Sequence, residues 1–152
     1  MGIVRLEDNA GSERIVSLRL ICVLALLALC GCSGGQMTVY RLQKDAGSLG
    51  SFAAEGQMLA GMAADARAPS SYVSTHSSEL GADTGDLASV VGSTEPTALT
   101  ARSRRQLLDL ATEATALFEE LEHAPNDRGK AQEIATRFGH IADSAAKIEE
   151  QG

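Results

Sequence analysis

Residues 131–148 read AQEIATRFGHIADSAAKI, and their pattern decides the fold. Apolar residues recur at alternating intervals of three and four: Ala131, Ile134, Phe138, Ile141, Ala145 and Ile148. This spacing is the heptad repeat of helices that pack against one another, with one apolar face. The stretch therefore predicts an amphipathic helix that buries one face against its neighbours.

A second helix with the same repeat precedes this stretch. Its apolar residues are Leu107, Leu110, Ala114, Leu117 and Leu121. We expect Thr94 to be its N-cap, with Pro96 in the first turn, where proline is tolerated. Residues 124–127, Ala-Pro-Asn-Asp, predict a stop, a turn and a cap for the next helix. A connection this short predicts an antiparallel helical hairpin.

The charges of the two segments favour antiparallel pairing. Basic residues begin the first segment and acidic residues end the second, so the hairpin would bring them together: Arg102, Arg104, Arg105, Glu149 and Glu150. At the turn it would bring together Glu119, Glu120, Glu122, Arg128 and Lys130. Exposed ion pairs contribute little stability, but their pattern selects between parallel and antiparallel packing.

Two further helices are expected upstream. In residues 49–67, apolar or small residues recur at alternating intervals of four and three: Phe52, Gly56, Leu59, Ala63 and Ala66. Residues 70–91 carry an apolar stripe of Val73, Leu80 and Leu87, completed by Val90 or Val91. Gly81 and Gly85 interrupt this second pattern, at about 1 kcal/mol each relative to alanine. The sequence predicts an all-α, up-down four-helix bundle over residues 49–152.

Composition agrees with a helical core and excludes one class of partner. Aromatic residues make up 3% of the chain and tryptophan is absent, so small and aliphatic side chains must fill the core. Such side chains suit closely spaced helices better than a β-sandwich. The formal charge of −7 argues against nucleic-acid binding, which needs a basic face.

Histidine and methionine form no recognisable metal or haem site. His76, His123 and His140 belong to no His-x-x-x-His or Glu-x-x-His motif. A haem of the b-type cytochrome bundles would need Met58 or Met62 with His140, yet Met58 and His140 fall outside the predicted apolar faces. His76 is interpreted as a polar interruption of its helix. The sequence thus predicts a non-enzymatic protein without a resident cofactor or metal.

The N-terminal segment has the features of an export signal. Ten apolar residues, Leu20 to Leu29, are too few to span a membrane, which takes about 20. Their length is that of the apolar core of a signal peptide. The segment before such a core usually has a net positive charge, but residues 1–19 contain three basic and three acidic residues. Two of the three cysteines, Cys22 and Cys30, lie in this segment, and Cys32 follows it.

Residues 29–32, Leu29-Cys30-Gly31-Cys32, resemble the signal peptidase II motif of bacterial lipoproteins. That motif is an aliphatic residue, a small residue, glycine or alanine, and then cysteine. Cys30 stands where alanine or serine is more usual. The resemblance implies removal of residues 1–31 and a diacylglyceryl thioether on Cys32, whose new amine is a further acylation site. It places the protein on a bacterial membrane, facing the periplasm or the cell exterior, and the absence of aspartate at Ser33 favours the outer membrane.

Residues 32–48 are expected to be the lipidated cysteine and a flexible tether, since they contain several glycines and serines. The apolar residues within the tether would form a first helical turn or dock on the domain: Met37, Val39, Tyr40 and Leu42. A tether of this length places the domain, and hence its partners, near the membrane surface.

The expected function is a non-enzymatic binding or scaffold module for a protein of the cell envelope. The alternative is a carrier of a small ligand, a metal or haem, with its site inside the bundle. Self-association is a third possibility, because heptad faces also pair between molecules. Arg102, Arg104 and Arg105 are interpreted as a solvated face, the other interpretation being contact with anionic lipid headgroups.

Overall fold

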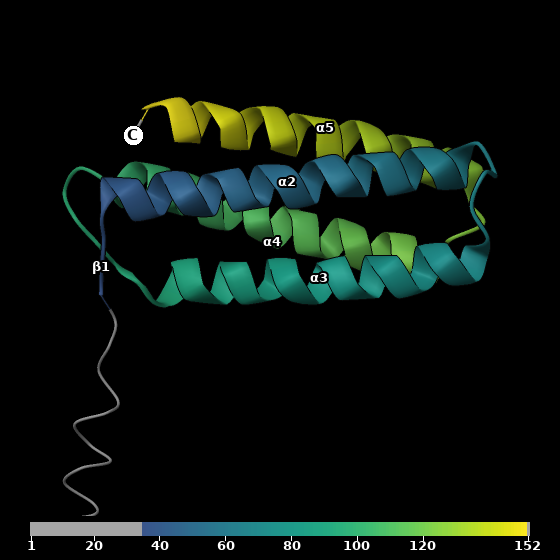
Figure 1. The fold of residues 1–152 in the computed structure, drawn as a ribbon, viewed down its shortest axis with the longest axis horizontal. Helices are drawn as coiled ribbons and strands as arrows, with labels where there is room; N and C mark the ends of the chain where they lie inside the picture. The colour runs from purple at the N-terminus through teal and green to yellow at the C-terminus, as the bar shows by residue number, and fades with distance from the viewer. Residues whose placement is uncertain (1–34, 152) are drawn as a thin grey trace, which may run out of the picture. The chain divides into compact units, whose positions relative to one another are not determined.

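The computed structural model describes residues 35–151 and confirms an all-α four-helix bundle (Figure 1). The helices are α2 (Val39–Ala64), α3 (Ser70–Ser93), α4 (Ala101–His123) and α5 (Arg128–Gln151). Two short strands, β1 (Gln36–Met37) and β2 (Glu95–Pro96), pair in parallel at one end of the bundle. Among the described residues, no helix has the length and apolarity that crossing a membrane requires.

The helices alternate in direction, and the predicted antiparallel hairpin of α4 and α5 is confirmed. Asp127 caps α5 as the sequence predicts, since its carboxylate accepts from the Lys130 N–H at 3.0 Å. The most extensive packing, however, joins α2 to α5 and α3 to α4, while α4 and α5 contact one another less. The bundle is therefore built from two close helix pairs, α2 with α5 and α3 with α4, and the α4–α5 hairpin is not one of them.

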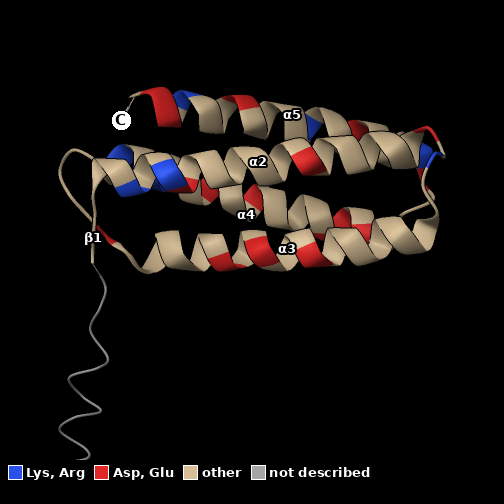
Figure 2. Ribbon diagram, viewed as in Figure 1, with Lys and Arg blue, Asp and Glu red and all other residues tan. Residues whose placement is uncertain are grey.

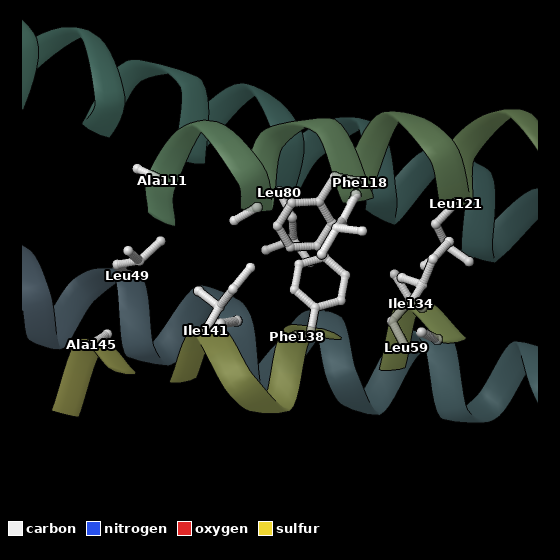
Figure 3. Close-up of a cluster of buried hydrophobic side chains, with 14 of the residues drawn as sticks. Leu49, Leu59, Leu80, Ala111, Phe118, Leu121, Ile134, Phe138, Ile141 and Ala145 are labelled. Atoms are coloured by element: carbon white, nitrogen blue, oxygen red, sulfur yellow. The ribbon is translucent and has the colours of Figure 1, made fainter. Parts of the chain in front are cut away.

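The α5 heptad face is buried throughout, from Ala131 to Ile148, as predicted. In α4, Leu110 is only half-buried and Ala111 takes the buried position beside it. Phe118 of α4 and Phe138 of α5 meet at the centre with their ring centroids 4.5 Å apart (Figure 3). These two rings fill the middle of a core that is otherwise built from small and aliphatic side chains.

The buried face of α2 includes Gly56, Leu59 and Ala63 as predicted, but not the other two predicted residues. Phe52 is half-buried and Ala66 is exposed, and the true stripe is Leu42, Ala46, Leu49, Ala53, Gly56, Ala60 and Ala63. Leu59 is buried beside this stripe. The two large residues Leu42 and Leu49 set this register, and both lie outside or at the margin of the segment predicted to be helical.

The folded domain begins earlier than predicted, which corrects the expected tether of residues 32–48. Residues 39–48 are the first turns of α2, and Met37 and Leu42 are buried in the core. Thr38 starts the helix, because its side-chain oxygen accepts the Arg41 N–H at 3.2 Å. Of the two alternatives for the apolar residues in this stretch, Met37 docks on the domain and Val39 onward are helical.

The predicted start of α4 at Thr94 is wrong. Thr94 ends α3, and Pro96 belongs to β2. Thr97 and Thr100 exchange hydrogen bonds just before the helix: Thr97 N–H donates to Thr100 Oγ1 at 3.0 Å, and Thr100 N–H donates to Thr97 Oγ1 at 3.3 Å. The Thr100 hydroxyl also donates to the Met37 carbonyl at 2.9 Å, which ties β1 to the loop before α4.

Residues 70–93 form one continuous helix despite Gly81 and Gly85. Gly81 allows α3 and α4 to pack closely. A Cβ atom at Gly81 would lie 3.3 Å from the Cβ atom of Phe118. The helix propensity lost at glycine is thus offset by packing that larger residues would prevent.

Candidate functional site

The predicted lipidation residue Cys32 and its recognition residues Leu29, Cys30 and Gly31 lie outside the described residues. Their roles stay predictions. What the structure adds is the position of the first described residue, Gly35, which leads directly into β1 at one end of the bundle. Gly35 stands three positions after Cys32 in sequence, and a chain of that length spans at most about 10 Å.

The residues considered for haem do not meet inside the bundle. Met58 is 59% exposed and His140 is exposed, as the heptad pattern predicts. His123 lies on the surface, with Nδ1 2.7 Å from the Glu119 carbonyl oxygen. Within residues 35–151, no three His, Cys, Asp or Glu side chains cluster as metal ligands would.

His76 lies between two carboxylates rather than merely interrupting α3. Its Nε2 is 2.8 Å from Glu55 Oε1 of α2, and its Nδ1 is 3.3 Å from Glu79 Oε2 of α3. The hydrogen bond to Glu55 is the largest influence and raises the pKa of His76 above its ordinary value of 6.5. Burial opposes this rise, and the hydrogen bond to Glu79 and the charges of both carboxylates add to it. Tyr72 stacks on the imidazole with the ring centroids 5.5 Å apart. This arrangement links α2 to α3 and was not predictable from sequence, because Glu55 and His76 belong to different helices.

Asp45 is the other side chain whose titration the fold perturbs. Its Oδ2 is buried without a hydrogen bond and lies 3.9 Å from Arg41 Nε. Burial raises the pKa of this carboxyl, and the charges of Arg41 and Lys44 offset part of the effect. One carboxylate beside one guanidinium in a helix end is an ion pair and gives no catalytic arrangement.

The predicted charge pairing is correct at the turn and wrong at the other end. Lys130 Nζ is 3.6 Å from Glu120 Oε2 across the α4–α5 turn. The ion pairs of the described residues include none between the arginines at the start of α4 and Glu149 or Glu150. Arg104 instead donates to the carbonyls of Val91, at 2.9 Å, and Gly92, and so caps the end of α3.

A groove of about 390 Å³ lies between α4 and α5, where the two helices contact one another less than in the close pairs. It is lined by Gln106, Asp109, Leu110, Ser144, Lys147, Ile148 and Gln151. Leu110 and Ile148 supply its apolar part, and side chains of both charges surround them. Leu110 is half-buried, because it packs against the edge of the core and also lines this groove.

A carrier would need polar side chains directed inward, and α3 has two of them, Ser77 and Thr84. The Thr84 hydroxyl donates to the Leu80 carbonyl of its own helix at 2.7 Å. The Ser77 oxygen is buried without a partner. A single free hydroxyl among apolar side chains does not make a ligand site, so the α4–α5 groove is the better candidate.

Comparisons with known proteins give no relative. No protein-family model matches the chain, no curated protein matches it, and no solved structure matches it. Any functional proposal therefore has to come from the residues of the chain itself.

Proposed function

We propose that this chain is a bacterial lipoprotein whose helical bundle is a non-enzymatic binding module for a protein of the cell envelope. The observation that carries the proposal is the Leu29-Cys30-Gly31-Cys32 motif placed three residues before the folded domain. Diacylglycerol on Cys32 supplies the two acyl chains that stable membrane attachment needs. The bundle then works at the outer face of a membrane.

The groove between α4 and α5 is the proposed partner site. Its two apolar side chains, Leu110 and Ile148, lie one on each wall, and the polar residues Gln106 and Lys147 border them. An amphipathic helix binds in such a groove by burying its apolar stripe and pairing its flanking charges with the rim. We propose a helix of an envelope protein as the occupant.

Crosslinking from the groove tests this proposal. A photoreactive amino acid at Gln106, which is exposed at the groove rim, is compared with one at Ser89, which is exposed on α3 away from the groove. The full chain is expressed in its native host and irradiated in intact cells. We expect Gln106 to give a protein adduct of one defined mass and Ser89 to give none. Identical adducts from both positions, or none from Gln106, would contradict the proposal.

The alternative of self-association has less support. The heptad residues that would pair between molecules are buried within one chain. In the same crosslinking experiment, an adduct at twice the mass of the chain would favour self-association over a distinct partner.

A further inference from the structure

The end of the bundle at which the described chain begins carries a charge opposite to that of the remainder. We define this N-terminal end as residues 35–45, 87–107 and 145–151, which include β1, β2 and the neighbouring helix ends. It contains six basic and four acidic residues, against four basic and thirteen acidic residues in the rest of the described chain. In Figure 2, basic segments gather at this end on α2 and α4, while acidic segments lie along α3. An acidic protein thus has one locally basic end.

Two of the three arginines at the start of α4 have no polar side-chain partner among the described residues. Arg102 and Arg105 are exposed, and neither takes part in an ion pair or side-chain hydrogen bond of the described residues. Arg104, by contrast, is engaged with the end of α3. The first two guanidinium groups are therefore available to an anionic partner.

The largest exposure of apolar side chains in the described chain occurs at the same end. Leu99, in the loop before α4, is 86% exposed, and Tyr40, in the first turn of α2, is 77% exposed. An aliphatic side chain in water gains free energy when it enters an apolar phase. Tyrosine is enriched at the membrane–water interface, where its ring and its hydroxyl both find a suitable environment.

We propose that the N-terminal end docks on a bilayer containing anionic phospholipid, with Leu99 and Tyr40 inserted and Arg102 and Arg105 against the headgroups. This inference rests on the proposed function, because a lipid on Cys32 would hold this end within about 10 Å of the bilayer surface. Basic residues close to an anionic surface are attracted to it, and the attraction is screened by salt. Docking would fix the orientation of the long axis of the bundle and hold the α4–α5 groove close to the bilayer surface, since Gln106, Ile148 and Gln151 of its lining belong to the same end.

A single thiol-specific label tests this orientation in the mature, lipidated protein. Removal of residues 1–31 and lipidation of Cys32 leave no other free thiol, so Ala98→Cys or Asn126→Cys gives a unique site. Both residues are exposed, Ala98 beside Leu99 and Asn126 in the turn at the opposite end. The labelled protein is reconstituted in vesicles of phosphatidylethanolamine and phosphatidylglycerol that carry a lipid-borne fluorescence quencher. Intact mass confirms lipidation before each measurement.

We expect quenching at position 98 and none at position 126. Arg102→Glu with Arg105→Glu should abolish quenching at position 98, as should high salt or vesicles of phosphatidylcholine alone. Arg128→Glu, an exposed charge reversal at the opposite end, is the matched control and should leave it unchanged. None of these arginines supports the fold through an ion pair of the described residues, so folding should be retained.

Equal quenching at both positions would overturn the docking proposal, because the bundle would then have no fixed orientation. Quenching at position 98 that survives the charge reversals would also overturn it, since the short connection to Cys32 would suffice. If position 98 contacted native membranes but not the vesicles, the N-terminal end would dock on an envelope protein instead of on lipid, and the docking proposal would be overturned. In each of these cases the lipid mass remains on Cys32 and the proposed function stands, whereas its absence would overturn both.

Discussion

Gly56 determines how closely α2 approaches the two central aromatic rings. A Cβ atom at this position would lie 2.9 Å from Phe118 and 2.9 Å from Phe138. These rings are fully buried and packed against one another, so neither has space to move away (Figure 3). A small residue at the middle of the α2 stripe is therefore a requirement of the core.

We predict that Gly56→Ala destabilises the bundle although alanine is the better helix former. Overpacking typically costs about 1–3 kcal/mol, which exceeds the propensity gain of about 1 kcal/mol. Gly61→Ala is the control on the same helix, because nothing lies within 4 Å of a Cβ atom there. That control should be stabilised by about 0.5–1 kcal/mol. Urea unfolding of both variants measures the difference, and equal stability changes would contradict the packing shown in Figure 3.

His76 makes a second prediction, in which stability depends on pH. Because the carboxylates of Glu55 and Glu79 raise the pKa of His76 in the folded state, its stabilising effect is complete below the unfolded value of 6.5. It is lost as the pH rises through the higher folded pKa. His76→Ala should therefore lower the free energy of unfolding, measured by urea unfolding, more at about pH 5.5 than at about pH 8.5. The difference should be a few tenths of a kcal/mol, because the contact is near the surface. His140→Ala, at an exposed position outside the ion pairs of the described chain, is the control and should show no such difference.

At the scale of the helices, the sequence predicted interiors better than ends. The heptads of α4 and α5 identify their buried faces because large apolar residues repeat over several turns. The start of α2 was missed because Gly47 and Ser48 suggest a linker, while the packing that makes them helical comes from α5, about a hundred residues away in sequence. Gln43 Nε2 donates to the Glu149 carbonyl at 3.1 Å across this pair. The start of α4 was missed because Thr94 and Pro96 are a good capping pair locally, whereas in the fold Thr94 ends α3 and Pro96 pairs with Met37 of β1.

Thr100 is the residue that holds β1 to the loop before α4. Thr100→Val keeps its shape and removes the hydroxyl that binds the Met37 carbonyl and accepts the Thr97 N–H. We expect a loss of about 1 kcal/mol and faster hydrogen exchange at Met37 and Thr97. Thr112→Val is the control, since its exposed hydroxyl bonds only to the Leu108 carbonyl of the same helix. Unchanged exchange in β1 in the Thr100 variant would show that the strand is held by other contacts.

For the molecule as a whole, the fold class was predictable and the candidate partner site was not. Heptad spacing defines four helices, but which helices pack most closely depends on small residues at facing positions of distant segments, such as Gly50 of α2 and Ala145 of α5. The α4–α5 groove forms because α2 packs closely on α5 and α3 on α4, which leaves α4 and α5 in looser contact. No local sequence motif predicts such a groove. The proposed lipidation site is the reverse case, because the Leu29-Cys30-Gly31-Cys32 motif that suggests it is short and contiguous in sequence.

The short connection between Cys32 and the bundle relates the proposed lipid to the position of the folded domain. If Cys32 carries the proposed lipid, a domain whose first described residue, Gly35, stands three positions later would have little freedom to move away from the bilayer. The basic N-terminal end, the exposed Leu99 and the groove at the side of α4 then have a defined relation to the membrane. All of this depends on lipid at Cys32.

The intact mass of the mature protein, purified from the membrane fraction of its native host, tests that claim most directly. We predict a chain that begins at Cys32 and carries the added mass of diacylglycerol. Cys30→Ser should give the same product, since serine is usual at that position of the motif, and Cys32→Ser should give none. An unlipidated chain, found free in the soluble exported fraction, would contradict the account.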